Sequence, residues 1–402
     1  MNWKLVLGIL VCNIVFMSFS YTMLIPFLPL YLTDELGVSA ADVHVWSGLV
    51  FSATFVVSTI MAPVWGKLAD SRGKRPMAIR SCLFLSLSYF CGGLVTSPEQ
   101  LVLMRLLQGF AYGLWPMDLA IMTLYAPKEK LGFCLGTMQG VMTAGSVVGP
   151  LIGGTLAELF GMRYSFFIAA GLLFLNGLMF IFFIKEPPDP DKGTVHQTDS
   201  GGILSQFTVL RVPLIRNMLL CGALIQMVIF ILQPILSTYI TSLAGDLPNL
   251  TFVTGLIFSL AGISGAFAAP VWGRIGQRRG FIRTLMWSLV LTGCWMMVQG
   301  LPRTLTLFAA TQFISGLFFS GINPSLNAIM AQHTPSNFKG RIYGLLFTAQ
   351  QLGSIAGPLL GGVVATWWGM RSVFFVAAAF LLSASVMLYH TYHNREPKPV
   401  SF

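Results

Sequence analysis

Twelve hydrophobic segments, each long enough to cross a lipid bilayer, constrain the fold of this 402-residue chain more than any other feature. A transmembrane helix needs roughly 20 mainly apolar residues, and in lipid only helices and closed barrels satisfy their own backbone hydrogen bonds. The chain is 55% hydrophobic, with a mean hydropathy of +0.75 and 9% charged residues, which is far from the composition of soluble proteins. We therefore predict an all-α membrane protein with twelve transmembrane helices at about 4–32, 45–69, 76–97, 99–126, 131–159, 163–184, 214–244, 250–275, 281–300, 302–332, 338–366 and 370–392.

The second half of the chain repeats the first at an offset of 207 or 208 residues. Ala-Pro-Val-Trp-Gly begins at residue 62 and again at residue 269, and the glycine- and proline-containing block 145–154 returns at 353–362. Many transporter folds are built from such repeats. We predict two pseudo-symmetric six-helix halves, 1–184 and 214–402, joined by a polar, proline- and glycine-rich cytoplasmic linker at 185–213.

The distribution of cations predicts the orientation. With both termini on one side, 20 of the 24 Lys and Arg residues fall on that side, which the positive-inside rule identifies as the cytoplasm. We expect a multi-pass protein of the inner or plasma membrane with both termini cytoplasmic. The net charge of +10 then reflects loops that face an anionic leaflet, so no nucleic-acid partner is expected.

The sequence shows no signal for a metal site, a cofactor or an enzyme. All six cysteines lie inside predicted spans, and the five histidines lie in loops or at helix ends. No glycine-rich loop followed by Lys and Ser/Thr is present to bind ATP. We therefore expect no cofactor, no metal and no enzymatic activity.

A charged stretch, Gly-Lys-Leu-Ala-Asp-Ser-Arg-Gly-Lys-Arg at 66–75, separates the second and third predicted spans. Gly66 is expected to let two helix ends approach closely, and Gly73 to supply the positive φ of a tight turn. Asp70, with Lys74 and Arg75, is expected to form an inner gate by bonding Arg75 and the start of the eleventh span near 339–341. An ordinary cytoplasmic loop would also explain this composition.

The fourth span carries two ionisable residues deep in the membrane, Arg105 and Asp118. Charged groups in lipid are costly and usually face a partner or a water-filled cavity, so both are candidates for proton coupling or a charge network. They are 13 residues apart, and on one continuous helix they would point to nearly opposite faces. Arg105 could instead extend to the outer surface, although Gln312 replaces it in the repeat. Asp118 could carry a proton, or pair with inner cations such as Arg72 or Arg75.

The fifth span contains a glycine motif that the eleventh span repeats. Glycines four residues apart allow close helix packing, and prolines bend helices. Packing alone would explain the motif; the functional alternative is a sliding surface between the halves. The residues are Gly145, Gly149, Pro150, Gly153 and Gly154.

Amide, aromatic and methionine side chains near the middle of several spans form a candidate substrate cavity. Such a lining suits apolar or weakly cationic molecules of varied shape, although Phe and Met also face lipid and amides also join helices. The candidates are Asn13, Met17, Tyr21, Tyr112, Gln226, Phe230, Gln233, Phe319, Asn323 and Gln350.

These motifs resemble those of the major facilitator superfamily, and within it the twelve-helix drug:proton antiporters, close to bacterial multidrug exporters. The family loop pattern matches at Gly66, Asp70 and Gly73, and the glycine motif of the fifth span is similar to the antiporter signature. The resemblance implies a monomeric exporter of small molecules that exchanges them for protons across the lipid bilayer by alternating access.

Three departures from the family pattern affect these expectations. Ser71 stands where the loop pattern has an arginine, and Gln277 where its second copy would have an aspartate. The first span has no acidic residue before Asp34, where several proton-coupled relatives keep one. An uncoupled carrier of a metabolite or lipid is therefore the first alternative. A non-transporting receptor or scaffold is the second, although the chain has little sequence outside the spans.

Overall fold

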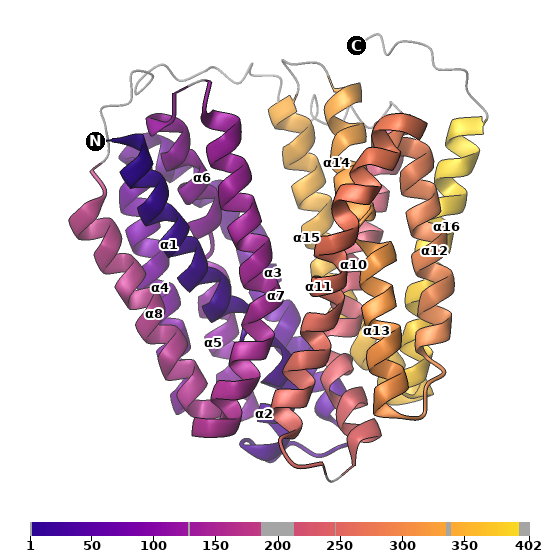
Figure 1. Ribbon diagram of the computed structural model, residues 1–402. Helices are drawn as coiled ribbons and strands as arrows, with labels where there is room; N and C mark the ends of the chain where they lie inside the picture. The colour runs from indigo at the N-terminus through magenta and orange to yellow at the C-terminus, as the bar shows by residue number, and fades with distance from the viewer. Residues whose placement is uncertain (1, 128, 186–212, 246, 335–338, 394–402) are drawn as a thin grey trace. The chain divides into compact units, whose positions relative to one another are not determined.

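The computed structural model describes the chain except for residues 1, 128, 186–212, 246, 335–338 and 394–402 (Figure 1). Every regular element within these described ranges is a helix. Ten helices or helix pairs there are long and apolar enough to cross a membrane. The chain divides into two compact units, 1–197 with 247–259 and 198–246 with 260–402. The domain boundaries expected from the sequence stay a prediction.

In the first unit, helices form at all six segments predicted for the first half. Their bounds are α1 Trp3–Thr22, η1 Ile25–Phe27, α2 Leu28–Asp34, α3 Val43–Arg72, α4 Lys74–Leu94, α5 Pro98–Phe110, α6 Leu114–Tyr125, α7 Leu131–Phe160 and α8 Met162–Phe183. The first segment breaks at Pro26 and Pro29, because proline lacks the N–H that continues a helix.

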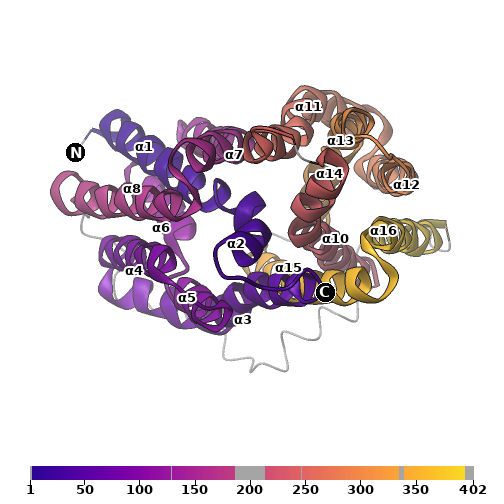
Figure 2. The same ribbon diagram turned by 90° about the horizontal axis from the view of Figure 1, so that it is seen from below.

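The second unit repeats this order of helices. The bounds are α10 Pro213–Ala244, α11 Leu250–Arg279, α12 Phe281–Gln299, α13 Leu305–Phe319, α14 Ile322–His333, α15 Lys339–Trp368 and α16 Met370–His393; the first part of α11 groups with the first unit. Figure 2 shows α4 beside α8 in one unit and α12 beside α16 in the other, pairs that pack extensively. The helix pairs that correspond to each other in the sequence repeat therefore also pack in the same way in the two units.

The fourth predicted span is not one helix, which corrects the sequence analysis. It consists of α5 and α6, separated at 111–113, where Gly113 adopts φ +125°. A residue without a Cβ takes up this backbone conformation at little cost. The helical-wheel relation expected between Arg105 and Asp118 therefore does not apply, because the two side chains lie on different helices.

Single glycines join four pairs of long helices. Gly73, Gly161, Gly280 and Gly369 have φ of +109°, +88°, +88° and +82°, and each is the only residue between two helices. The positive φ expected at Gly73 is confirmed. Side chains are strained in this region of φ, so only glycine fits such a short turn readily.

Each unit has apolar clusters inside and apolar side chains outside. The first unit contains one cluster around Tyr31 and Phe166 and another around Cys82 and Phe180, and a third cluster fills the second unit. Large apolar residues are nevertheless exposed, with Phe267 at 75% and Leu159 at 69%. A soluble protein rarely exposes so many, whereas lipid solvates them well.

Candidate functional site

Arg105 is buried inside the first unit rather than extended to a surface. Its side chain is 6% exposed, and its Nη1 donates a hydrogen bond to Oε1 of Gln108 at 2.7 Å. The guanidinium carbon lies 5.5 Å from the ring centroid of Phe51 on α3. These contacts hold the guanidinium in place, but Nε of Arg105 has no hydrogen-bond partner within the described ranges.

The charge of Arg105 is not balanced by a neighbouring acid. No carboxylate of the described part of the chain forms an ion pair with it. An uncompensated cation in a membrane protein is costly, so it is retained where function needs it.

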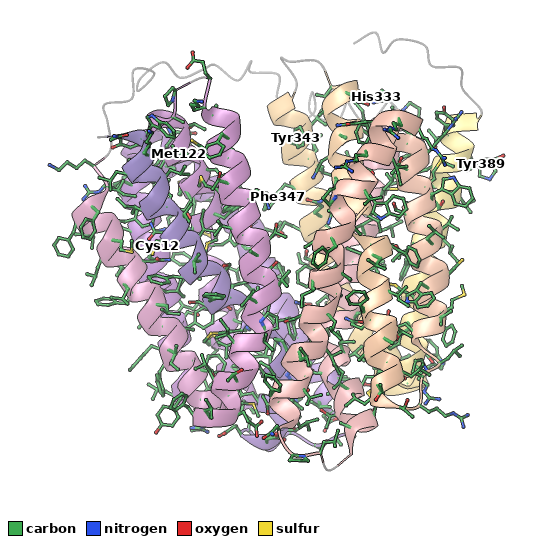
Figure 3. The ribbon with its side chains drawn as sticks, viewed as in Figure 1. Cys12, Met122, His333, Tyr343, Phe347 and Tyr389 are labelled. Carbon is green, nitrogen blue, oxygen red and sulfur yellow. The ribbon has the colours of Figure 1, made fainter. Side chains whose placement is uncertain are left out.

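Asp118 is a buried acid of the same unit, and it too lacks a hydrogen-bond or ion-pair partner among the described residues. It lies on α6 one turn before Met122, which Figure 3 labels, and its side chain is fully buried. Both carboxylate oxygens lack a hydrogen-bond donor among the residues the structure describes. The predicted pairing with Arg72 or Arg75 is therefore not present here. Arg75 donates instead to the main-chain oxygens of Phe180 and Ile181.

Two side chains hold the break between α5 and α6. Nε1 of Trp65 donates to the main-chain oxygen of Phe110 at 2.9 Å, and Nη2 of Arg80 donates to that of Tyr112 at 3.0 Å. The guanidinium carbon of Arg80 lies 3.6 Å from the centroid of the Trp65 ring, a cation–π geometry. These interactions satisfy carbonyl groups that the interrupted helix leaves open.

Sequence analysis missed Arg80, which it counted among the inner cations. A signal was available, because the residue lies within a predicted span and the uncharged Trp287 takes its place in the repeat, at the local offset of 207. The tryptophan contact, by contrast, occurs in both units, since Nε1 of Trp272 donates to the oxygen of Leu317 at 2.7 Å. The first unit therefore carries two cations, Arg80 and Arg105, at positions where the second unit has uncharged residues.

In the inner-gate loop, Gly73 has the predicted positive φ, but Gly66 does not show the predicted close approach of two helices. A Cβ added at Gly66 would meet no atom of the described residues within 4 Å, so the close helix approach expected there is not observed within the unit. Close approach occurs instead at Gly109 on α5, whose added Cβ would lie 2.4 Å from the main-chain oxygen of Thr54. The side chains at 339–341, the expected partners of Asp70, lie outside the described residues. The latch, with Lys74 and Arg75, stays a prediction.

The glycine motif of α7 packs directly on α1. A Cβ added at Gly145, Gly149 or Gly153 would lie 1.9 Å from Ser18 Oγ, 1.8 Å from Thr22 Oγ1 or 2.2 Å from the main-chain oxygen of Met23. Pro150 lies inside the continuous helix, and Gly154 faces the backbone at 251–252, which groups with the same unit.

The glycines of α15 pack on α10 in the same way. Added Cβ atoms at Gly353, Gly357 and Gly361 would lie 2.1, 2.5 and 2.4 Å from main-chain oxygens of α10. Helix packing within a unit thus accounts for these contacts, and the sliding surface between halves stays a prediction.

The residues expected to line a substrate cavity lie in both units. Asn13, Met17 and Phe230 are buried; Oε1 of Gln233 is buried and has no donor within the described part of the chain. The candidates other than Asn13, Met17 and Phe230 are partly buried as whole residues: Tyr21, Tyr112, Gln226, Gln233, Phe319, Asn323 and Gln350. That all these residues line one cavity stays a prediction.

We expect Arg105→Gln to reduce transport by at least about tenfold with little change in folded yield. The repeat supports an amide there, because Gln312 occupies the equivalent place and accepts a hydrogen bond from Gln299. Transport rate per folded molecule is the measurement. Arg163→Gln, which removes a partly exposed arginine that contacts Glu35, is the matched control. Equal rates for the two variants would contradict a functional role for Arg105.

Known proteins resemble this chain over most of its length. The family model described as Major Facilitator Superfamily matches residues 10–280 and 218–402. The multidrug resistance protein MdtG of Yersinia enterocolitica is 33% identical over 390 residues, covering 96% of this chain and 93% of that protein. The uncharacterized MFS-type transporter YuxJ of Bacillus subtilis is 33% identical over 374 residues, with coverages of 93% and 95%.

Solved structures show the same fold at low sequence identity. The nucleoside transporter NupG superposes with a TM-score of 0.81 at 16% identity, covering 97% of this chain and all of that one. A bacterial homologue of the lysosomal transporter Spinster, in an inward-facing occupied conformation, gives 0.80 at 16% identity, with 96% of each chain covered.

Proposed function

Because this chain belongs to the major facilitator superfamily, we propose that it exports small apolar or cationic molecules by alternating access in exchange for protons. Membership makes it a multi-pass membrane transporter rather than an enzyme. The MdtG relatives, named for multidrug resistance, support efflux of varied compounds as the specific activity. The excess of cations on one side supports a cell-membrane location with both termini cytoplasmic, and we propose a monomer.

The observation that carries proton exchange is the isolated carboxyl group of Asp118. A buried acid that no donor contacts can take up a proton and so lose a charge that is costly in the membrane interior. Gain and loss of this charge would favour different conformations of the protein. Arg105, also buried and without an acid partner among the residues that the structure describes, would supply a fixed positive charge in the same unit.

Purified protein in liposomes tests this proposal. A permanently charged cationic dye should accumulate inside vesicles with an acidic lumen, because outward proton movement would drive its uptake. A permanent charge prevents passive trapping by protonation, and protein-free vesicles control for leak. Equilibration of the dye without accumulation would support the uncoupled carrier instead. Neither binding nor transport of any member of a dye panel would support a scaffold.

We expect substrate selectivity to depend on the aromatic side chains of Tyr112 and Phe230. Truncating either to alanine should change apparent affinity for some dyes severalfold more than for others, because a loose apolar site contacts each molecule differently. Apparent KM across the dye panel is the measurement. Loss of activity by one common factor for every dye would show that these residues are structural.

A further inference from the structure

A pocket of about 500 Å³ lies in the second unit, at the end of that unit where α10 and α15 finish and α16 begins. Two arginines, Arg303 and Arg371, are its charged residues, and both are exposed. The rest of the lining is uncharged and includes apolar side chains: Tyr239, Ser242, Leu243, Trp368, Gly369 and Met370. The pocket belongs to none of the sites described above.

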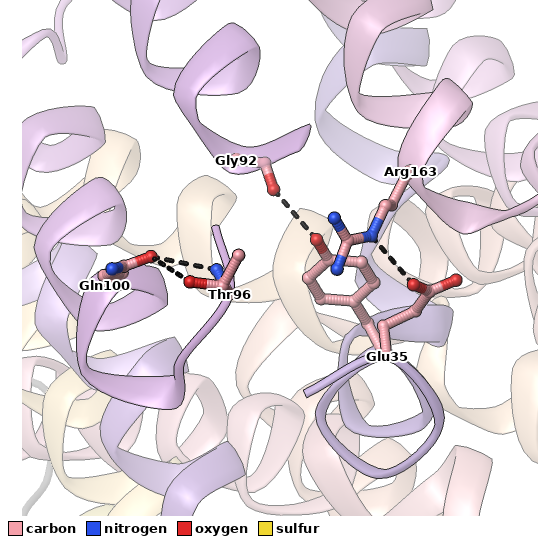
Figure 4. Close-up of polar contacts among 6 residues, drawn as sticks. Glu35, Gly92, Thr96, Gln100 and Arg163 are labelled. Atoms are coloured by element: carbon pink, nitrogen blue, oxygen red, sulfur yellow. Dashed lines mark hydrogen bonds and ion pairs between the residues drawn. The ribbon is translucent and has the colours of Figure 1, made fainter. Parts of the chain in front are cut away.

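The corresponding region of the first unit has the same supporting framework. Tyr31 donates its hydroxyl to the main-chain oxygen of Gly92 at 3.1 Å (Figure 4), and Tyr239 donates to that of Pro302 at 3.0 Å. The Tyr31 ring packs on Phe166 at 5.0 Å and the Tyr239 ring on Phe374 at 5.4 Å. The two regions can therefore be compared position by position.

Their charges differ. In the first unit, Nε of Arg163 contacts Oε2 of Glu35 at 2.8 Å, as Figure 4 shows, so the two charges cancel. At the repeat offset, Arg371 replaces Arg163 but Leu243 replaces Glu35. Arg303 adds a second cation at the place of Thr96, because the offset in this part of the repeat is 207. The pocket thus has two positive charges and, within the described ranges, no carboxylate in its lining.

The surroundings favour an anion at the depth of the lipid headgroups. The pocket includes the first residues of α16, and the N-terminal end of a helix attracts negative charge. Trp368 is 66% exposed and Trp367 73%, with ring centroids 6.2 Å apart. Exposed tryptophans of this kind concentrate at the boundary between lipid and water. In the first unit, Leu159 and Phe160 occupy these two positions.

We propose that this pocket binds a phosphate group, held between the guanidinium groups of Arg303 and Arg371. Arginine donates paired hydrogen bonds that match the geometry of phosphate oxygens. Leu243 is the residue that leaves the pocket available, because a glutamate there would neutralise Arg371 as Glu35 neutralises Arg163. The phosphate can come from an anionic phospholipid headgroup or from free phosphate in solution.

Titration of the full-length protein in detergent separates these sources. Phosphatidylglycerol, phosphatidylcholine and inorganic phosphate are added in turn, and bound molecules are counted by native mass spectrometry. We expect the double variant Arg303→Gln/Arg371→Gln to weaken binding by at least about tenfold. If the weakened ligand is phosphatidylglycerol, the site binds a lipid headgroup. If inorganic phosphate alone is bound and lost, the site binds free phosphate.

Two further variants keep the test specific. Arg163→Gln removes one partly exposed positive charge from the first unit and should leave phosphate binding unchanged. Leu243→Glu retains both arginines but supplies the missing carboxylate, so it should weaken binding as strongly as loss of one arginine. Each variant is checked for an unchanged Tm without added ligand. Equal affinities for the original protein and the double variant, or an equal loss in Arg163→Gln, would overturn the proposal.

Discussion

Replacing Asp118 by asparagine is expected to abolish the accumulation of substrate that a pH gradient drives, while exchange of substrate down its own gradient continues. Asparagine has nearly the same shape as the neutral acid but cannot release or bind a proton. The side chain is fully buried and no donor contacts its oxygens in the described structure, so the substitution breaks no hydrogen bond there. The protein should therefore fold normally and lose only its coupling.

Two measurements on the same liposomes test this expectation. Dye accumulation with an acidic lumen should fall to the level of protein-free vesicles, and counterflow of labelled against unlabelled dye should keep its rate. Glu158→Gln, an exposed acid on α7, serves as the matched control and should keep both activities. Gradient-driven accumulation by the Asp118 variant would show that another group carries the proton.

The second large effect is expected from Gly153→Ala on α7. The added Cβ would lie 2.2 Å from the main-chain oxygen of Met23 and 2.6 Å from its Cβ, so α1 and α7 would have to separate. Overpacking of this kind costs about 1–3 kcal/mol. We expect a lower Tm, a smaller folded yield and reduced transport.

Gly140→Ala on the same helix is the control for this substitution. An added Cβ there meets no atom of the described part of the chain within 4 Å, and alanine favours the helix by about 1 kcal/mol relative to glycine. Its Tm should therefore equal or exceed that of the original protein. A similar fall in Tm for both variants would show that the contact with α1 does not matter.

Local chemistry explains why parts of this fold could be predicted from sequence. Apolar length marked the spans, and Gly73 predicted a tight turn. Each of these features depends on residues close together in the chain. The repeat then extended the prediction from one half to the other.

The remaining features depend on residues that are distant in the chain. Nothing near Gly113 shows that Trp65 and Arg80 will hold the carbonyl groups of an interrupted helix. Likewise, close approach at Gly109 rather than Gly66 depends on where α3 crosses α5. The environment of Asp118 is also a tertiary property, because its isolation follows from what α6 packs against.

The single-residue joints at Gly73, Gly161, Gly280 and Gly369 have a consequence for protein engineering. With one residue between two helices, any inserted segment would interrupt either the tight turn or the end of one of the helices. The joints therefore leave no room for epitope tags or fused reporter domains, whereas the longer connection between α2 and α3 does.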